Sequence, residues 1–334
     1  MSEKITLAHG DGGELAHQLV RKVFVEAFEH DEEARFDAAL LSLEGGNAAV
    51  STDSFVIKPI FFPGGDIGKL AVSGTVNDIA VSGAEPRFLT AGFILEEGFP
   101  VKDLRKIVRS MAEEAKKAGV KIVAGDTKVV ERGSADGLYI HTTGFGVVRP
   151  ERRPRPDLIR EGDAVIVSGT IGDHGIAILA ARGELGLSSN VTSDCACLNG
   201  MISDVLSSVN GVRIMRDPTR GGLATTLVEI CEDFGVTVLL DEASLPVKRE
   251  VHGACDIFGF DPLYLANEGK VIIIAAKEEE EAVLESLRSH PLGRDAAVIG
   301  RVTGRGKGQL LFRSTLGSTR RLGRLNGMML PRIC

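Results

Sequence analysis

The chain has 334 residues, 43% of them hydrophobic, and a net charge of −7, so it can bury more than one core and two domains are expected. The acidic balance and the lack of Trp argue against a nucleic-acid partner, and neither an apolar secretion signal nor a membrane-length apolar run is present. We therefore expect a protein that binds neither nucleic acid nor membranes. Five cysteines, an odd number, suit a reducing compartment better than a disulfide framework, so we expect the protein to be cytoplasmic.

The first half of the chain is predicted to mix helices and strands. Apolar residues at helical spacing predict a helix over 14–29, and a clearer one runs from Pro100 to Gly119, where the glycine ends it. A short helix is predicted over 74–82, after an irregular loop over 61–68. Strands are predicted over 38–43, 48–57, 88–95, 120–124 and 138–148.

The second half repeats this mixture after a linker. Residues 149–160 hold three prolines and five arginines and are predicted to join a domain over 1–150 to a domain over 151–322. Helices are predicted over 175–182, 198–209, 222–234 and 277–289, and strands over 164–168, 236–240, 270–276, 296–302 and 309–312. Because helices and strands do not alternate one for one, we expect two α+β domains of sandwich type with mixed or antiparallel sheets, rather than a doubly wound parallel sheet.

Residues 323–334 read as a mobile tail that ends in a thiol. Glycines and Pro331 interrupt regular structure, and Cys334 is the final residue. From residue 301 onward there are eight Lys or Arg and no Asp or Glu, whereas the rest of the chain is acidic. The tail is therefore expected to approach something anionic: the body of its own protein, the phosphates of a nucleotide or an acidic partner. A terminal cysteine is often incidental, so a role for this thiol depends on a matching site upstream.

Aspartates at the predicted ends of strands and turns are the main sign of such a site. They are Asp53, Asp78, Asp126 and Asp217. Each alone is equally typical of a helix cap or a turn, but Asp78 lies in a helix otherwise made of small and apolar residues. Glu268 supplies a further carboxylate just before a strand. Several carboxylates converging on one point require a cation, and oxygen ligands of this kind favour Mg²⁺ bound to phosphates.

Two glycine-rich segments look like nucleotide motifs but lack their spacing. Residues 64–69 are one residue short of a Walker loop and have no Ser or Thr to hold Mg²⁺, and residues 169–175 miss the dinucleotide-binding spacing. The composition of 64–69 still permits a backbone nest for phosphate. Cys195 and Cys197 are too close together for a zinc knuckle and are expected to be structural.

Together, eight segments carry a resemblance to a known family. They are Thr52-Asp53-Ser54-Phe55, Phe61-Phe62-Pro63-Gly64-Gly65-Asp66, Asn77-Asp78-Ile79-Ala80, Gly125-Asp126-Thr127-Lys128, Gly172-Asp173-His174-Gly175, Asp217-Pro218-Thr219-Arg220-Gly221-Gly222, Asn267-Glu268-Gly269 and Pro331-Arg332-Ile333-Cys334. On these residues the chain resembles the HypE family of hydrogenase-maturation carbamoyl dehydratases. The acid-bearing segments alone indicate the wider superfamily of aminoimidazole ribonucleotide synthetase and selenophosphate synthetase, and the terminal segment narrows it.

The resemblance implies an N-terminal domain that dimerises through its sheet, a C-terminal α+β domain, and ATP with Mg²⁺ held between the two domains. The implied metal ligands are Asp53, Asp78, Asp126 and Asp217. The implied nucleotide-binding residues are Gly64, Gly65, Asp66, Asn77, Asp78 and Thr127. His141, in a strand where a smaller polar residue is expected for this family, has no assigned role.

The resemblance further implies that Cys334 carries a carbamoyl group, which ATP-dependent dehydration converts to a thiocyanate, supplying cyanide ligands for the iron of nickel-iron hydrogenase. Glu268 is the first choice for the base and His174 the second, while Lys128 would stabilise developing charge. The carbamoyltransferase HypF would load Cys334, and the HypC–HypD scaffold would receive the nitrile. Two alternatives stay open: an ATP-dependent synthetase acting on a free small molecule, and a non-catalytic carrier or scaffold.

Overall fold

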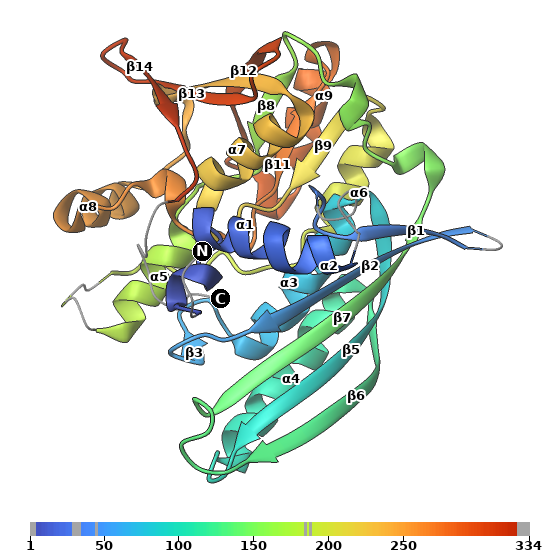
Figure 1. Cartoon of the computed structure of the whole chain (residues 1–334), viewed down its shortest axis with the longest axis vertical. Helices are drawn as coiled ribbons and strands as arrows, with labels where there is room; N and C mark the ends of the chain where they lie inside the picture. The colour runs from blue at the N-terminus through green and yellow to red at the C-terminus, as the bar shows by residue number, and fades with distance from the viewer. Residues whose placement is uncertain (1–4, 29–34, 44–45, 184–185, 187–188, 326–334) are drawn as a thin grey trace.

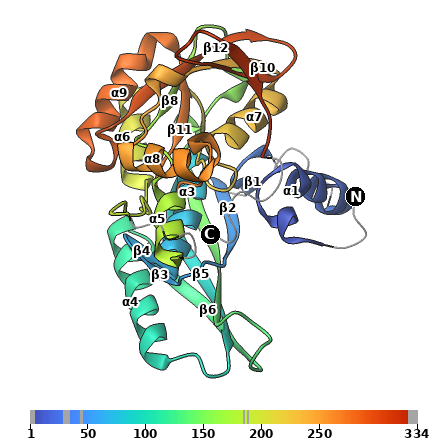
Figure 2. The ribbon, with the colours of Figure 1, turned by 90° about the vertical axis from the view of Figure 1, so that its left-hand side faces the viewer.

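The structure, a computed structural model, describes residues 5–28, 35–43, 46–183, 186 and 189–325. Cys334 and the rest of the predicted tail beyond residue 325 lie outside the described residues. Two sheets, one in each half of the chain, organise the molecule, and Figures 1 and 2 show them in two domains, one above the other. No helix in the described ranges combines the length and hydropathy needed to span a bilayer.

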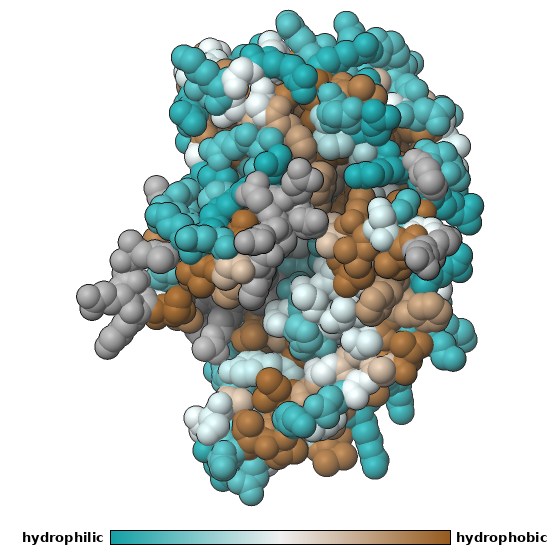
Figure 3. All heavy atoms as spheres, turned by 45° about the vertical axis from the view of Figure 1, so that its right-hand side comes forward, coloured by the Kyte–Doolittle hydropathy of each residue, from teal (hydrophilic) through white to brown (hydrophobic). Residues whose placement is uncertain are grey.

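The first domain is built on a five-stranded sheet in the order β1-β2-β7-β5-β6. Its strands are β1 (Ala39–Leu43), β2 (Gly46–Phe55), β5 (Ala84–Glu96), β6 (Lys121–Val130) and β7 (Leu138–Val148). Every neighbouring pair is antiparallel except β5 with β6. Helices α3 (Ile67–Val81) and α4 (Val101–Ala118) cover one face. In this single chain the other face leaves Phe88 and Phe145, which are directly paired, about half exposed, and Figure 3 shows hydrophobic atoms among polar ones on this half of the molecule.

Helix α3 is longer than the predicted helix over 74–82, because Asp66 starts it. The Asp66 carboxylate accepts the N–H groups of Gly68 and Lys69 at 2.8 and 3.0 Å, which is an N-cap. The preceding residues, predicted as an irregular loop, form the two-stranded hairpin of β3 (Phe61–Phe62) and β4 (Gly65–Asp66). Glycine is needed at position 68, inside the helix, because a Cβ there would lie 2.5 Å from the Ile107 carbonyl oxygen. Gly68 therefore allows α3 to pack closely against α4.

The second domain is built on a mixed seven-stranded sheet in the order β14-β13-β10-β12-β8-β11-β9. Its strands are β8 (Ala164–Val167), β9 (Val212–Arg216), β10 (Val236–Asp241), β11 (Ile272–Ala275), β12 (Ala297–Arg305), β13 (Gln309–Arg313) and β14 (Thr319–Leu322). Its helices are α5 (Asp173–Arg182), α6 (Asn199–Ser208), α7 (Gly222–Phe234), α8 (Arg249–Phe258) and α9 (Glu280–Ser289). The apolar side chains of α7 and of α6 with α9 belong to two separate cores that share this sheet. The predicted α+β class is confirmed, although β9, α8 and β14 were not predicted.

The N-terminal segment packs against the second domain. It consists of a 3₁₀ turn (Leu7–Gly10), α1 (Glu14–Leu19), a π-helical stretch (Val20–Val25) and α2 (Glu26–Phe28), so the predicted single helix is irregular in its middle. The Arg21 guanidinium pairs with Asp233 at 3.4 Å, and the N–H of Glu14 donates to the Leu325 carbonyl at 3.1 Å. The first and last described segments of the chain therefore lie side by side.

Four of the eight cations in the basic C-terminal region form ion pairs with the acidic body of the protein. Ion pairs join Arg301 to Glu280, Arg313 to Asp241, Arg320 to Asp261, and Arg324 to Glu232. The sequence left three anionic targets open for this region. Four of its cations contact one of these targets, the body of the same protein.

Candidate functional site

Four carboxylates from both domains meet at a small buried cavity. Asp53 of β2 and Asp78 of α3 come from the first domain, while Asp217 follows β9 and Glu268 precedes β11 in the second. All four line a cavity of about 30 Å³. Asp53, Asp78 and Asp217 also line an adjoining cavity of about 390 Å³, and the lining of this cavity includes His9, Gly10, Gly12, Ala16 and His17. Four of the sequence-predicted acids therefore share one site at the domain boundary.

Strand alternation and a short hydrogen bond place the two acids of the first domain. Asp53 pairs in register with Thr142, whose hydroxyl contacts Thr75 of α3 at 2.5 Å, so this row of the sheet faces the helix. The Ser51 hydroxyl, two residues before Asp53 on the same face, donates to the Asp78 carboxylate at 2.5 Å. The strand and the helix thus present their acids to the same space.

Asn267 fixes the turn that carries Asp217. Its side chain is fully buried, and its amide donates to the carbonyls of Pro218 and Leu265, both at 3.0 Å, while its oxygen accepts the Gly172 N–H at 2.8 Å. The turn needs glycine at Gly222, where φ is +64° and a Cβ would lie 2.6 Å from two carbonyl oxygens. One amide therefore ties together the loops that follow β8 and β9.

The acids are crowded and poorly compensated, which raises their pKa values. Burial first, and then the charge of Asp217, raises the pKa of Asp78 well above its usual range. Burial and Asp37 raise the pKa of Asp217 to about 8. Burial and Asp217 likewise raise the pKa of Glu268, and its Oε1 atom is buried without a hydrogen-bond partner among the described residues. Buried like charges of this kind are protonated or neutralised by a cation.

The carboxylate oxygens of this site suit a hard cation such as Mg²⁺ that is also coordinated by the phosphates of a bound molecule. Carboxylate oxygens are the protein ligands of Mg²⁺, which commonly uses one or two of them together with substrate phosphates. Within the described ranges, no three His, Cys, Asp or Glu side chains are arranged as a ready-made metal site. The described residues thus surround a cavity with carboxylates but do not by themselves form a complete set of metal ligands.

One chain does not bring Asp126, Thr127 and Lys128 to these acids. The strand predicted to end before Gly125 continues to Val130, and this motif lies inside β6 at the sheet edge. Asp126 is in the row of Gly92, His141 and Ser54, which faces away from α3, and Lys128 pairs with Asp126 at 3.1 Å with both side chains largely exposed. Their predicted roles stay predictions, and at these acids they would need a second chain.

The predicted nucleotide-binding residues of the first domain are engaged in structural contacts. Asp66 caps α3, and Gly64 accepts the Lys69 ammonium at 2.9 Å while packing against the backbone of Ser193. Gly65 packs against Phe62 and Lys69. Asn77 is buried, and its amide group bonds to the Ala196 carbonyl and to the Leu198 N–H. Nucleotide binding by these four residues stays a prediction.

His174 lies outside both cavities. It is fully buried in α5, where its Nδ1 contacts the Ser193 hydroxyl at 2.8 Å and the Phe62 ring meets it edge-on at 5.7 Å. This position favours Glu268 over His174 as the base.

Burial also raises the pKa of the Cys231 thiol to about 12 and that of the Cys255 thiol to about 11, so these thiols stay protonated.

His141, left without a role by the sequence, brackets Asp53 from the open face of the sheet. Its ring nitrogens contact the Ser54 hydroxyl at 2.8 Å and the Thr52 hydroxyl at 3.0 Å, one residue on either side of Asp53. The ring therefore holds the strand that presents this acid.

Several residues at the site were missed by the sequence analysis. Arg220 lines both cavities, and its charge lowers the pKa values of Asp53 and Glu268 against the effect of burial. Arg216 pairs with Asp37 at 2.6 Å beside the larger cavity. The presence of Arg220 in the Asp217 motif was a usable signal, whereas the partnership of Asp37 with Arg216 depends on tertiary contacts alone.

Comparison with known proteins gives the family. Residues 35–148 match the N-terminal domain, and residues 160–313 the C-terminal domain, of AIR synthase related proteins. The chain is 48% identical to the carbamoyl dehydratase HypE of Rhodobacter capsulatus over 335 residues, covering 99% of this chain and 98% of the relative. It is also 48% identical to the carbamoyl dehydratase HypE of Escherichia coli K12, with 99% of each chain covered.

Solved structures agree with this relationship. A HypE in a HypE–HypF complex superposes with a TM-score of 0.86 at 49% identity, covering 92% of this chain and 99% of that one. A HypE in complex with ATP gives a TM-score of 0.83 at 45% identity, covering 99% and 100%. The resemblance seen in the sequence is confirmed, and the chain belongs to the carbamoyl dehydratase HypE family of AIR synthase related proteins.

Proposed function

We propose that this protein uses ATP to dehydrate a carbamoyl group on Cys334 to a thiocyanate, which serves as the source of cyanide for the iron of nickel-iron hydrogenase. The proposal extends to this chain what the names of its relatives state, namely carbamoyl dehydratase activity and, for one solved relative, ATP binding. Mg²⁺, the thiocyanate product and the homodimer are parts of the proposal that rest on the residues described above.

The observation that carries the proposal is the position of the last described residue. Leu325 accepts the N–H of Glu14 at 3.1 Å, and its own N–H donates to the Thr225 hydroxyl at 3.3 Å. Glu14 follows the segment 9–12 that walls the larger cavity. The nine residues from 326 to 334, if extended, could span at most about 30 Å, which is enough to bring a thiol at the chain end into that cavity.

The chemistry needs a leaving group and a base. Overall, S–C(=O)–NH₂ loses one oxygen and two protons to become S–C≡N, and ATP supplies the phosphoryl group with which that oxygen departs as phosphate. Glu268 would accept a proton from the carbamoyl nitrogen, because the residue lines the small cavity and its Oε1 is buried without a hydrogen-bond partner among the described residues. Its raised pKa means that the ionised form of Glu268 is a stronger base than an ordinary carboxylate.

Asp53, Asp78 and Asp217 would hold Mg²⁺, which when bound neutralises phosphate charge. Burial raises the pKa of all three, and neighbouring carboxylates raise those of Asp78 and Asp217 further, so a bound cation would relieve an unfavourable concentration of negative charge. Arg220, on the same cavities, is placed to contact the remaining phosphate charge.

We further propose that the open sheet face of the first domain pairs with a second copy. The face exposes Phe88, Ile94, Phe145 and Val147 by 42% to 49%, beside Asp126 and Lys128. Such a contact buries these apolar side chains and lets Lys128 act at a site of the other chain. HypF is proposed as the partner that loads Cys334, since one relative is solved with HypF, and HypC–HypD as the acceptor.

The test is the mass of Cys334. The protein is incubated with HypF and its carbamoyl donor, purified, and measured before and after addition of Mg²⁺ and ATP. We expect a carbamoyl adduct that then loses the mass of one water molecule, and no such change in a Cys334→Ser variant. ATP turnover on a free small molecule with Cys334→Ser fully active would instead support a synthetase, and an adduct unchanged by ATP would support a carrier.

A further inference from the structure

A segment of the second domain, residues 193–198, crosses to the first domain and is held there by hydrogen bonds. The Ser193 N–H donates to the Pro63 carbonyl at 2.8 Å. The Asn77 amide donates to the Ala196 carbonyl at 3.0 Å and accepts the Leu198 N–H at 2.8 Å. Asn77 directly precedes Asp78, so this crossing segment is fixed next to one of the acids of the site.

The same crossing segment holds the backbone of Glu268 on both sides. The Glu268 N–H donates to the Asp194 carboxylate at 3.1 Å, and the Glu268 carbonyl accepts the Ala196 N–H at 3.3 Å. At Gly269 a Cβ would lie 1.9 Å from the Asp194 carbonyl oxygen. No side chain therefore fits between the backbone at Gly269 and the backbone of the crossing segment. Glu268 is thus seated by the crossing segment itself.

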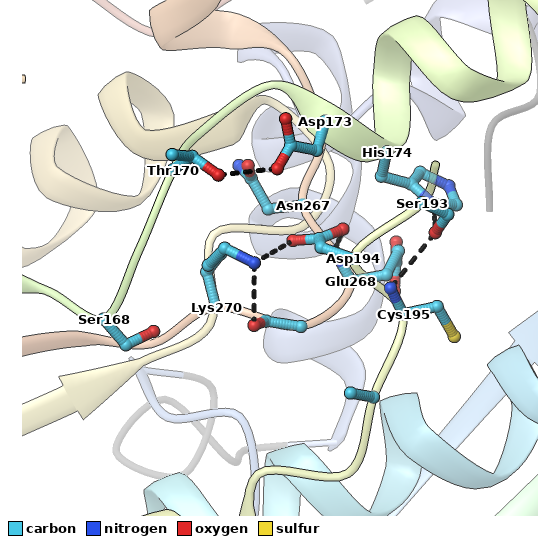
Figure 4. Close-up of polar contacts among 12 residues, drawn as sticks. Ser168, Thr170, Asp173, His174, Ser193, Asp194, Cys195, Asn267, Glu268 and Lys270 are labelled. Atoms are coloured by element: carbon cyan, nitrogen blue, oxygen red, sulfur yellow. Dashed lines mark hydrogen bonds and ion pairs between the residues drawn. The ribbon is translucent and has the colours of Figure 1, made fainter. Parts of the chain in front are cut away.

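Asp194 is a buried charge with its own counter-ion. Lys270 Nζ lies 3.1 Å from Asp194 Oδ2 and donates to the Gly269 carbonyl at 3.3 Å, and both side chains are at most 10% exposed. Figure 4 shows Lys270 pointing at Asp194, with Glu268 on the other side of that carboxylate. Burial alone raises the pKa of Asp194, but Lys270, His174 and the Glu268 N–H outweigh it and lower the pKa, so Asp194 is ionised.

We propose that Asp194 is a positioning residue for Glu268, with Lys270 as its buried counter-ion. The inference rests on the proposed function, in which Glu268 is the base. Because Oε1 of Glu268 has no hydrogen-bond partner in the described part of the chain, the place of this carboxyl group is set by its main-chain anchors and by packing. Asp194 supplies one of these anchors, and Asn77 ties the same segment to the helix of Asp78.

This role predicts a defect in the chemical step rather than in nucleotide binding. Asp194 lines neither of the two cavities of the site, so it does not contact a bound nucleotide there. A displaced base slows proton transfer strongly even for shifts of about 1 Å, and removal of such supporting residues typically costs roughly 10- to 100-fold in activity.

The test compares two variants that both lack the buried charges. Asp194→Asn/Lys270→Met keeps an oxygen that can accept the Glu268 N–H, and Asp194→Leu/Lys270→Met does not. Full-length protein is carbamoylated on Cys334 with HypF, and the ATP-dependent loss of water is followed by mass in a single turnover at several ATP concentrations. We expect the Leu double variant to be slowed roughly 10- to 100-fold with its KM for ATP unchanged, and the Asn double variant to recover most of the rate.

Two controls separate the possible failures. Asp163→Leu/Arg213→Met removes another buried pair of the same domain, joined at 3.2 Å and also anchoring a backbone N–H, that of Arg160; its rate is expected to match wild type. Equal rates in the two Asp194 double variants, or equal slowing in the Asp163 control, would overturn the positioning role. If Glu268→Gln is inactive while the Leu double variant is normal, only the positioning role fails; if Glu268→Gln is fully active, the proposed base fails and the inference with it.

Discussion

Asp78, on a helix of the first domain, and Asp217, after a strand of the second, face one buried cavity, and the charge of Asp217 adds to burial in raising the pKa of Asp78. The two domains thus meet at a point of electrostatic repulsion. Sites that collect charge at the expense of stability are typical of ligand binding, because the ligand supplies the missing countercharge. Stability and activity should therefore respond in opposite directions to changes here.

Asp78→Asn is the first such change. In the nucleotide-free protein it should raise the free energy of unfolding at pH 8 by about 1 to 3 kcal/mol, the typical penalty of an uncompensated buried polar group, because burial and Asp217 disfavour the charged form of Asp78. The amide oxygen can still accept the Ser51 hydroxyl. ATP-dependent loss of water from carbamoylated Cys334 should disappear. Denaturant unfolding and the mass assay measure the two effects. The exposed Glu113→Gln, which also removes one negative charge, should change neither; a destabilised or fully active Asp78→Asn would contradict the role of Asp78.

The pH dependence of stability should carry the signature of Asp217. Its pKa of about 8 in the folded protein, against 3.8 for the ordinary group, means that between these pH values the folded state holds a proton that the unfolded chain has released. Stability should therefore fall as pH rises from about 4 to 8, by several kcal/mol and at most about 5 from this group. Unfolding in EDTA at several pH values measures the slope. Asp217→Asn and added Mg²⁺ with ATP should each flatten it, and an unchanged slope in Asp217→Asn would show that other groups set it.

The sequence predicted which acids line this site better than it predicted the contacts that hold them in place. Asp53, Asp78, Asp217 and Glu268 were all identified, because short acidic motifs at the ends of elements are visible in a linear pattern. The fold class followed from the irregular order of helices and strands. The tail over 323–334 was predicted in the same way, and its part beyond residue 325 lies outside the described residues.

The supporting contacts could not be predicted because they join residues far apart in sequence. Nucleotide binding by Asn77 stays a prediction, whereas the bonds of its amide to Ala196 and Leu198, about 120 positions away, were not predicted. Asp126 looked like the end of a strand, yet β6 continues past it and turns it away from Asp53. Such facts depend on which face of a sheet a helix covers and on which loop crosses between domains, and neither is encoded in local spacing.

His174→Leu should separate a structural histidine from a catalytic one. Removing the ring leaves the buried Ser193 hydroxyl without its 2.8 Å partner and should cost about 1 to 3 kcal/mol of stability. Because His174 lines neither cavity, the rate per folded molecule should stay within about twofold of wild type, against the 10² to 10⁴ expected for loss of a base. Unfolding and single-turnover mass measurements test this. A rate loss of that size at unchanged stability would restore His174 as the base.

Lys128→Ala should reveal whether two chains build one site. Lys128 contacts Asp126 on the surface, with both side chains about 70% exposed, and such a pair contributes about 0 to 1 kcal/mol, so stability should not change. Activity should nevertheless fall sharply, because Lys128 is proposed to act on the site of a second copy.

Mixing Lys128→Ala with Asp78→Asn then gives the decisive result. If each site takes Asp78 from one chain and Lys128 from the other, a mixed dimer contains one intact site, and two inactive proteins should regain activity after being unfolded and refolded together. Chains carrying both substitutions, refolded with Asp78→Asn, should stay inactive, since Asp78 is then missing from every site. Inactivity of the first mixture, with mixed dimers confirmed by mass under native conditions, would show that no site combines Asp78 of one chain with Lys128 of the other, and the two-chain site would be wrong.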